Sequence, residues 1–500
     1  MSYKPPFSFK KKYDQYINGA FVEPSSGKYF DNISPIDGKV ISKIAQGNAQ
    51  DIEKALDAAH NALATWSETS VTDRSNIMLK AAQLIEDNAE VLAQAETLDK
   101  GKVIRESIGD VADCADHLRY FAGVIRADEG SASELDSNTL SVNIPEPIGV
   151  VGAIIPWNYP LLIFIWKLAP TLATGCTMVV KPAEQTPASI LVMMEIIGSV
   201  IPKGVVNVVN GFGKEAGAPL AQSAKVDKIT FTGSTATGQQ LMRYAAESII
   251  PTTMELGGKS PNVFMPSIAD EDDDFYDKCV EGAVLFALNQ GEDCTCPSRL
   301  LIHEDIYEDF IARIIARTES IKQGNPFDEE TQISTQVSKS QYDKILNYIQ
   351  IGIDEGCEVL CGGAVSEISD IALQDGFYIK PTILKGHNKM RVFQEEIFGP
   401  VVCVTTFKNH QEAIEIANDT KYGLGAAVWT RDMHEAYLMP RKIKAGRVWV
   451  NNYHTYPAHA PFGGYKQSGY GRENHKMMLS GYRKNKNILI SYDKQKWDWF

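Results

Sequence analysis

The chain has 500 residues, of which 44% are hydrophobic and 22% charged, a composition typical of soluble globular proteins with two or three domains. Its formal net charge of −14 argues against a nucleic-acid partner, because affinity for a phosphate backbone depends on clustered Lys and Arg. No signal peptide is visible, and prolines and Lys167 interrupt the most apolar stretch, 148–170. With eight scattered cysteines, these features predict a cytoplasmic protein without a membrane span.

Helical spacing dominates residues 51–127. Apolar residues recur three or four positions apart in 51–66, 74–99 and 112–127, and helix-forming residues are frequent there. A β-branched stretch bounded by prolines follows at 140–156. We therefore expect a helical N-terminal region that leads into a sheet.

Strands and helices then alternate along the chain. Strands are expected at 177–182, 204–211 and 228–233, and helices at 187–200 and 234–248. This order predicts a parallel sheet with helices on both faces. A second alternation occupies roughly 260–450, so two α/β units in tandem are predicted. Within it, the acidic run 270–274 is interpreted as a solvated loop or helix start rather than a cation site.

Three glycine-containing stretches resemble nucleotide-binding motifs without matching them. The stretch 211–217 has the spacing G-x-G-x-x-x-G, and 257–260 lacks the required preceding glycine, because Thr253 occupies that position. The stretch 233–238 lacks the lysine of a phosphate loop but lies between a strand and a helix. It could present backbone N–H groups to a cofactor diphosphate, or it could simply cap the helix through Ser234 or Thr235.

The cysteine spacing fits a metal site poorly. Cys294 and Cys296 form C-x-C, and the next close pair lies some sixty residues further on without histidine partners. No metal is therefore predicted. A disulfide is disfavoured because the expected cytoplasm is reducing. Cys176, Cys279 and Cys296 are interpreted as buried and inert.

Cys294 differs because it lies between a helical segment and a strand, next to the permissive Gly291. A nucleophilic thiol needs a base or a local field, and no histidine is near in sequence. Glu255, followed by two glycines, is a candidate base if it is desolvated, whereas a lone glutamate is more often a surface residue.

Seven stretches, taken together and in order, resemble the NAD(P)-dependent aldehyde dehydrogenase superfamily over nearly the whole chain. They are PWNYP (156–160), VVKPAEQTP (179–187), FTGSTATG (231–238), ELGGKSP (255–261), NQGEDCTCPSR (289–299), EEIFGP (395–400) and PFGGYKQSGYGRE (461–473). The CTCPSR stretch and the C-terminus look most like the bacterial acetaldehyde-type branch.

The resemblance implies a reaction in which Cys294 attacks an aldehyde and forms a thiohemiacetal, then a thioester. The Asn158 amide and the Cys294 backbone N–H would hold the oxyanion. Glu255 would activate the water that hydrolyses the thioester, and Lys167 and Glu473 would form a proton relay.

The resemblance also implies a cofactor site. Glu184 would accept a bond from the adenosine 2′-hydroxyl and repel a 2′-phosphate, so NAD is favoured over NADP. Lys181 shares this ribose site, Ser234 with the 233–238 turn would meet the diphosphate, and Glu396 the nicotinamide ribose. The remaining expected cofactor residues are Ile154, Pro156, Trp157, Gly213, Phe231, Gly233, Leu256, Gln336 and Phe398.

The expected aldehyde tunnel would be lined by apolar residues and would suit a small aliphatic aldehyde such as acetaldehyde. Its expected residues are Tyr159, Trp166, Leu288, Thr295, Tyr456 and Phe462. Asp113 and Asp293 stand where the acetaldehyde-type branch would have apolar residues. Both could face solvent, or together they could favour a cationic aldehyde such as an aminoaldehyde.

The fold implied by the resemblance is α/β. A Rossmann-like NAD-binding domain (1–127 and 148–258) is joined to an α/β catalytic domain (259–459). A β oligomerisation arm (128–147 and 478–500) and a return segment (460–477) packed on the active site complete it. Because a projecting arm exposes strand edges, we expect a homodimer or a dimer of dimers.

Two other functions compete with hydrolytic oxidation. A CoA-acylating relative would pass the acyl group to a thiol, but such relatives generally lack the glutamate at position 255. A catalytically silent protein on the same fold is disfavoured by the intact Cys294, Glu255 and Asn158.

Overall fold

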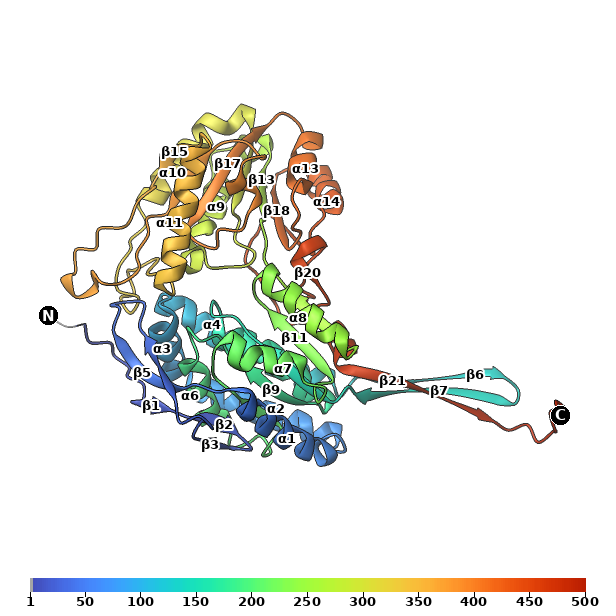
Figure 1. Ribbon diagram of the computed structural model, residues 1–500. Coiled ribbons are helices and arrows are strands. Elements are labelled where there is room, and N and C mark those ends of the chain that lie inside the picture. Colours follow the sequence, from blue (N-terminus) through green and yellow to red (C-terminus); the bar gives the residue numbers. More distant parts are fainter. Residues whose placement is uncertain (1–2) are drawn as a thin grey trace.

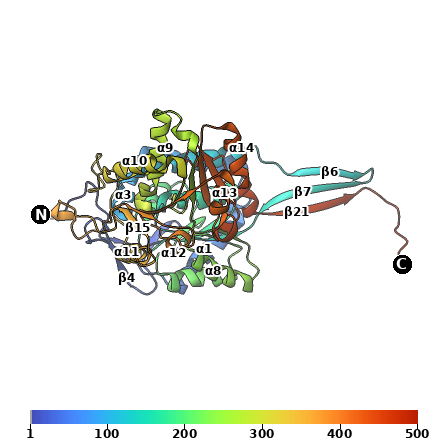
Figure 2. The same cartoon turned by 90° about the horizontal axis from the view of Figure 1, so that it is seen from above.

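The computed structural model describes residues 3–500. Figure 1 shows two α/β bodies and a long β arm that projects from them and ends near the C-terminus. Viewed from above, the arm still points away from both bodies (Figure 2). The expected α/β class is confirmed.

The first body is built on an eight-stranded sheet with the order β20-β12-β11-β8-β9-β10-β2-β3. Its central strands run parallel, whereas β2, β3 and β20 pair antiparallel at the edges. The strands are β2 (Gln15–Ile17), β3 (Ala20–Val22), β8 (Val150–Ile154), β9 (Thr177–Lys181), β10 (Val206–Val208), β11 (Lys228–Thr232), β12 (Thr252–Glu255) and β20 (Gly469–Tyr470). The predicted strands at 177–182 and 204–211 thus pair with each other as β9 and β10, and β8 separates them from the third predicted strand, β11.

The helices of this body include the predicted ones with shifted ends. They are α1 (Ala49–Trp66), α2 (Val71–Asp87), α3 (Ala89–Lys100), α4 (Ile104–Val124), α5 (Pro160–Thr174), α6 (Ala188–Ile197), α7 (Ala218–Gln222) and α8 (Thr235–Glu247). The continuous helical segment predicted at 74–99 is two helices, because the chain leaves helical geometry at Asn88, whose ψ is 22°. A small sheet, which the sequence patterns did not predict, orders β1 (Lys12–Tyr13), β5 (Val40–Ala45) and β4 (Tyr29–Ile33).

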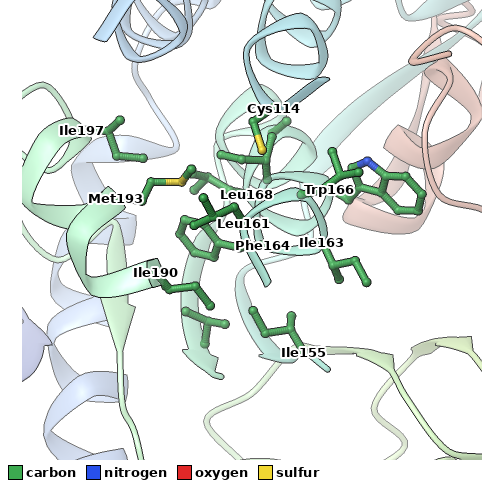
Figure 3. Close-up of a cluster of buried hydrophobic side chains, with 14 of the residues drawn as sticks. Cys114, Ile155, Leu161, Ile163, Phe164, Trp166, Leu168, Ile190, Met193 and Ile197 are labelled. Carbon is green, nitrogen blue, oxygen red and sulfur yellow. The ribbon is translucent and has the colours of Figure 1, made fainter. Parts of the chain in front are cut away.

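Helix α5 is the buried centre of the first body. All its residues are buried, since it is apolar on every face except at Lys167 and a few threonines. Leu161, Phe164 and Leu168 pack with Cys114 of α4 and Met193 of α6 (Figure 3). The rigid setting of α5 fixes the residues at and before its N-terminus, which the site uses.

The second body has a seven-stranded sheet with the order β15-β16-β17-β14-β13-β18-β19, parallel except for the edge strand β15. These strands are β13 (Pro261–Phe264), β14 (Arg299–His303), β15 (Glu358–Cys361), β16 (Thr382–Lys385), β17 (Val401–Phe407), β18 (Gly425–Trp429) and β19 (Arg447–Val450). The helices are α9 (Asp274–Val284), α10 (Tyr307–Glu319), α11 (Lys339–Asp354), α12 (Arg391–Gln394), α13 (His410–Asn418) and α14 (Met433–Lys442). Asp273, in the acidic run, caps α9 by accepting from Tyr276 N at 3.1 Å.

The arm is a three-stranded antiparallel sheet of β6 (Ser131–Asp136), β7 (Thr139–Pro147) and β21 (Arg483–Ser491). The prediction that its second piece begins at 478 is too early, because Met478, Leu479 and Tyr482 are buried in the core of the first body. Within residues 3–500 no helix is long and apolar enough to cross a membrane.

Candidate active site

Two cavities meet at Cys294. One is lined by Glu106, Asp110, Asp113, Tyr159, Leu162, Ile163, Trp166, Thr232, Glu255, Leu256, Leu288, Asp293, Cys294, Leu424, His454, Tyr456 and Phe462. The other is lined by Pro156, Trp157, Asn158, Thr232, Gly233, Ser234, Glu255, Leu256, Gly257, Cys294, Gln341, Lys344, Glu396 and Phe398. Their volumes are about 160 Å³ and 180 Å³. We call them the tunnel and the cofactor cavity. The residues they share are Thr232, Glu255, Leu256 and Cys294, so a thiol and a carboxylate face both.

A strained loop presents the thiol. Asn289 and Gln290 have φ angles of 46° and 56°, in the left-handed region, and Gly291 follows at 71°. A Cβ on Gly291 would lie 2.1 Å from the Gly399 carbonyl, so only glycine fits this approach. Cys294 emerges from the loop half-buried, whereas the other seven cysteines are buried and all are free.

A buried ion pair, which the sequence did not reveal, fixes this loop. The Lys100 Nζ lies 2.5 Å from the Glu292 carboxylate, and both side chains are fully buried. The other Glu292 carboxylate oxygen accepts from Val337 N at 3.1 Å. The Glu292 carbonyl accepts from the Asn158 Nδ2 at 3.1 Å. The pair therefore also orients the amide that was predicted to hold the oxyanion.

Glu255 ends β12 inside the protein rather than on its surface. It is 3% exposed, and neither of its carboxylate oxygens has a hydrogen-bond partner among the described residues. Burial, followed by the negative charge of Glu473, raises the pKa of Glu255 well above the ordinary carboxyl value, and Lys167 opposes the rise. The structure thus gives this carboxylate the properties of a general base near neutral pH.

The predicted relay residues form a buried ion pair. Lys167 on α5 contacts Glu473, and both side chains are fully buried. Neither lines the two cavities. Both charges act on Glu255, because Glu473 raises the pKa of Glu255 and Lys167 lowers it.

The turn 233–238 opens α8, as its position between a strand and a helix predicted. Ser234 caps the helix by accepting from Thr237 N at 3.3 Å, and it lines the cofactor cavity. Gly233 donates its N–H to the Glu255 carbonyl at 3.0 Å, which ties the turn to the base. Phe231 packs beneath it, where a Cβ on Gly233 would lie 2.5 Å from the ring.

The opposite wall of the cofactor cavity is held by Glu396. Its Oε1 accepts from Gly258 N at 2.9 Å, and a Cβ on Gly257 would lie 2.1 Å from its Oε2. Trp157 and Phe398 meet edge to face, with ring centroids 5.2 Å apart. Two glycines and two aromatic rings thus shape a slot in which a planar ring and a phosphate-bearing chain would fit.

Some predicted cofactor residues lie outside the cavity lining. The Lys181 Nζ forms an ion pair with Glu184 at 2.8 Å, and Ile154 lies beside Lys181 on the neighbouring strand. Gly213 follows β10 and is exposed. Gln336 is fully buried, and its side-chain amide donates to the Gln290 carbonyl at 3.4 Å. Gln336 thus lies outside the cavity lining, to which Gln341 and Lys344 of α11 contribute.

The tunnel brings together every predicted substrate residue except Thr295, which lies behind Asp293. Trp166 packs 5.7 Å from Phe462 and 6.4 Å from Tyr456, measured between ring centroids. Glu106, Asp110 and His454 also line the tunnel and were not predicted. The spacing of Glu106, Asp110 and Asp113 on one helix face could have revealed the first two.

Asp293 is 4% exposed and does not face solvent. It accepts from Tyr159 OH at 2.9 Å, and from the N–H and hydroxyl of Thr295 at 2.9 and 3.0 Å. Burial, followed by the charges of Asp293, Glu396 and Glu255, raises the pKa of Cys294 well above the ordinary thiol value.

An accessible thiol and a buried carboxylate that both face a tunnel and a glycine-lined cavity form an arrangement suited to an enzyme with a nucleophilic thiol. A family model described as the aldehyde dehydrogenase family matches residues 21–488. The chain belongs to the aldehyde dehydrogenase family, which confirms the resemblance drawn from its motifs.

Named relatives agree with this assignment. The chain is 60% identical over 486 residues to an aldehyde dehydrogenase of Vibrio cholerae, covering 97% of this chain and 96% of the relative. It is 56% identical over 485 residues to acetaldehyde dehydrogenase 2 of Cupriavidus necator, with 97% and 96% coverage. A crystal structure of betaine aldehyde dehydrogenase from Staphylococcus aureus in complex with NAD⁺ superimposes with a TM-score of 0.94 at 38% identity, covering 98% and 97% of the two chains.

Proposed function

We propose that this protein oxidises a small aldehyde to the carboxylic acid with NAD and that water, not CoA, receives the acyl group. The observation that carries the proposal is that Cys294 and the unpartnered carboxylate of Glu255 face both cavities. A nucleophile with a base that can reach the same reacting atom is what a two-step acyl transfer requires.

In the first step the Cys294 thiol loses its proton to solvent water, the sulfur attacks the aldehyde carbonyl carbon, and the carbonyl oxygen becomes an oxyanion. Asn158 donates one amide hydrogen to Glu292 and keeps the second for the oxyanion, beside the Cys294 backbone N–H. Removing one such donor typically lowers the rate by about 10²–10³-fold. When bound, NAD would accept a hydride from the carbon attached to sulfur, which leaves a thioester.

In the second step Glu255 removes a proton from water, which attacks the thioester and releases the acid and the thiol. The raised pKa of Glu255 makes it basic enough for this role and follows from its burial. The Lys167–Glu473 pair lies close enough to influence the charge of Glu255 and would pass the proton onward.

NAD fits the cofactor cavity by its chemistry. Gly233, Ser234 and the start of α8 would meet the diphosphate, because helix N-termini favour anions. Glu396 would bind the nicotinamide ribose, and Trp157 and Phe398 would flank the nicotinamide ring. Lys181 and Glu184 would hold the adenosine ribose, where the carboxylate disfavours a 2′-phosphate. Solved relatives of this fold contain NAD, one at 38% and another at 41% identity.

The substrate and assembly complete the proposal. Relatives named acetaldehyde dehydrogenase support a short aliphatic aldehyde, for which the tunnel volume of about 160 Å³ is sufficient. The exposed strands of the arm support a homodimer or homotetramer, because unpaired strand edges are normally covered by another chain. The eight free cysteines fit a reducing cytoplasm.

A single kinetic experiment tests the proposal. Acetaldehyde and NAD, mixed with the enzyme without CoA, should give NADH and free acetate in equal amounts. The Cys294→Ser variant should give no NADH above background. Acid formation that depends on CoA, or NADH formation that survives in Cys294→Ser, would contradict it.

A further inference from the structure

The tunnel is unusually acidic for the site of a small neutral aldehyde. Glu106, Asp110 and Asp113 lie at positions i, i+4 and i+7 of α4, so they share one helix face, and all three line the tunnel. Asp293 joins them from the loop that carries Cys294. Four carboxylates therefore surround a space next to the reacting sulfur.

These carboxylates differ in whether a lysine compensates their charge. Asp110 forms an ion pair with the buried Nζ of Lys102. The same Nζ also lies 3.4 Å from Glu96. Asp110 therefore has a cationic partner within the protein. Glu106 has one partner, the N–H of Asn289 at 3.4 Å. Asp113 has no side-chain hydrogen bond or ion pair among residues 3–500, and Asp293 receives neutral donors only from Tyr159 and Thr295.

Histidine does not supply the missing positive charge. His454 Nδ1 lies 3.3 Å from Asp293 and 3.2 Å from the Tyr456 hydroxyl, but burial lowers the pKa of His454, which disfavours the charged ring. Its Nε2 has no hydrogen-bond partner among the described residues, although the side chain is 7% exposed. The described residues that line the tunnel include no lysine or arginine.

The rest of the wall would accept a cation as well. Tyr159, Trp166, Tyr456 and Phe462 line the same tunnel, and aromatic rings attract a positive charge that lies over their faces. Lys102 already makes such a contact from behind, with its Nζ 3.9 Å from the centroid of the Tyr159 ring.

We propose that the preferred substrate is an aldehyde whose far end carries a protonated amine, bound between Asp113 and Asp293 while its carbonyl carbon meets Cys294. This inference rests on the proposed oxidation of aldehydes at the same site and names the chemical class of the substrate. An ammonium group supplies the positive charge that these two carboxylates lack. A neutral aldehyde of equal size does not supply it.

The test compares two substrates that differ only in this group. In 3-aminopropanal an ammonium replaces the terminal methyl group of butanal, so size and reach are nearly constant. We expect kcat/KM for 3-aminopropanal to exceed that for butanal by roughly 10-fold or more, since a nearby opposite charge typically shifts a pKa by 1–3 units. A ratio of one or less overturns the inference.

Variants assign the preference to the two carboxylates. Asp113→Asn should lower the ratio of the two kcat/KM values, and the Asp113→Asn/Asp293→Asn double variant should bring it to about one. Using a ratio removes any general loss of activity caused by changes beside Cys294. Asp116→Asn is the matched control, because it removes the same charge from α4 at an exposed position outside the tunnel lining and should leave the ratio unchanged.

Binding without turnover gives a second measurement for a variant with little activity. In the Cys294→Ser protein, 3-aminopropan-1-ol should bind more tightly than butan-1-ol, and adding Asp113→Asn and Asp293→Asn together should abolish the difference. Equal affinity of the two alcohols would overturn the inference. Failure of the proposed function is distinguishable, because then no aldehyde, charged or neutral, would give NADH with the unmodified enzyme.

Discussion

Buried carboxylates in and around the candidate site have opposite surroundings. Glu292 pairs with Lys100 and Glu473 pairs with Lys167, all four side chains being fully buried. Glu255 is 3% exposed and has no partner for either oxygen among residues 3–500.

The presence or absence of a lysine partner distinguishes the carboxylates that stabilise the fold from the one proposed to take part in the reaction. A buried carboxylate with a lysine partner holds two chain segments together, and removing one partner is costly. A buried carboxylate without a partner is destabilised in its charged form, which raises its pKa. The one of these carboxylates without a partner is thus the one to which the proposed mechanism assigns the role of base.

The largest effect is expected from removing the unpaired charge. Glu255→Gln should lower steady-state turnover by about 10²–10⁴-fold, the usual contribution of a general base. The first turnover should still release NADH, because the thioester forms before Glu255 activates water. Stopped-flow absorbance at saturating aldehyde should show a burst close to one NADH per site followed by a flat phase.

The pH dependence sharpens this prediction. Because the pKa of Glu255 is raised, the carboxylate is increasingly deprotonated as pH rises above the ordinary carboxyl range, so thioester hydrolysis should accelerate with pH. Glu255→Gln should lose that dependence. If the variant showed neither burst nor turnover, or if it kept the rise with pH, Glu255 would not be the hydrolytic base.

The next largest effect concerns a paired charge. Lys100→Met leaves Glu292 buried without its cation and should lower the free energy of unfolding by about 3–5 kcal/mol. Because the Glu292 carbonyl orients Asn158, kcat should fall as well. The double variant Lys100→Met/Glu292→Gln removes both charges and should recover part of the stability. Thermal denaturation of the three proteins measures this, and an unchanged melting temperature in Lys100→Met would refute the role of the pair.

A more exposed pair should behave differently. Lys181 and Glu184 lie 2.8 Å apart, but the Glu184 side chain is 32% exposed, so breaking the pair should cost under about 1 kcal/mol. Glu184→Gln should instead raise kcat/KM for NADP relative to NAD, by about 10-fold, because a carboxylate no longer faces the 2′-phosphate. Titration of both cofactors at fixed aldehyde measures the ratio, and Glu195→Gln on α6 is a suitable control at an exposed position. An unchanged ratio would place the adenosine ribose elsewhere.

The sequence predicts much of this fold because its signals are local. The β-branched runs of β9 and β11 and the turn at Gly233 and Ser234 depend on neighbours only a few residues away. The exposed strands of the small N-terminal sheet carry no comparable pattern, and α3 could not be separated from α2 by periodicity that continues across Asn88.

Site residues could be predicted from the sequence only where they lie within a sequence motif. Cys294 and Glu255 were predicted as site residues from stretches of sequence, whereas Gln341, which lines the cavity from α11, was not predicted. The Lys100–Glu292 pair joins residues 192 positions apart, and no spacing rule links them. The environment of Glu255, which gives it its chemistry, is a property of the packed interior and appears only in the structure.

The smallest effect is expected at Asp113, which lines the tunnel, is exposed, and has no side-chain partner among residues 3–500. Partial loss of solvent, followed by the charges of Asp110 and Asp116, raises the pKa of Asp113 to about 6. Since this value lies above the ordinary 3.8, the folded protein holds the proton more tightly, and that contribution to stability is lost as pH rises from about 4 through 6.

Asp113→Asn removes this pH-dependent term. The melting temperature of the variant should therefore rise relative to the parent protein between pH 4 and pH 7, by an amount that corresponds to less than about 1 kcal/mol because solvent screens the group. Asp116→Asn should show no such trend. A variant that became relatively less stable as pH rose would mean that the Asp113 carboxylate has a cationic partner in the resting protein. The tunnel would then have no uncompensated charge to offer an ammonium group.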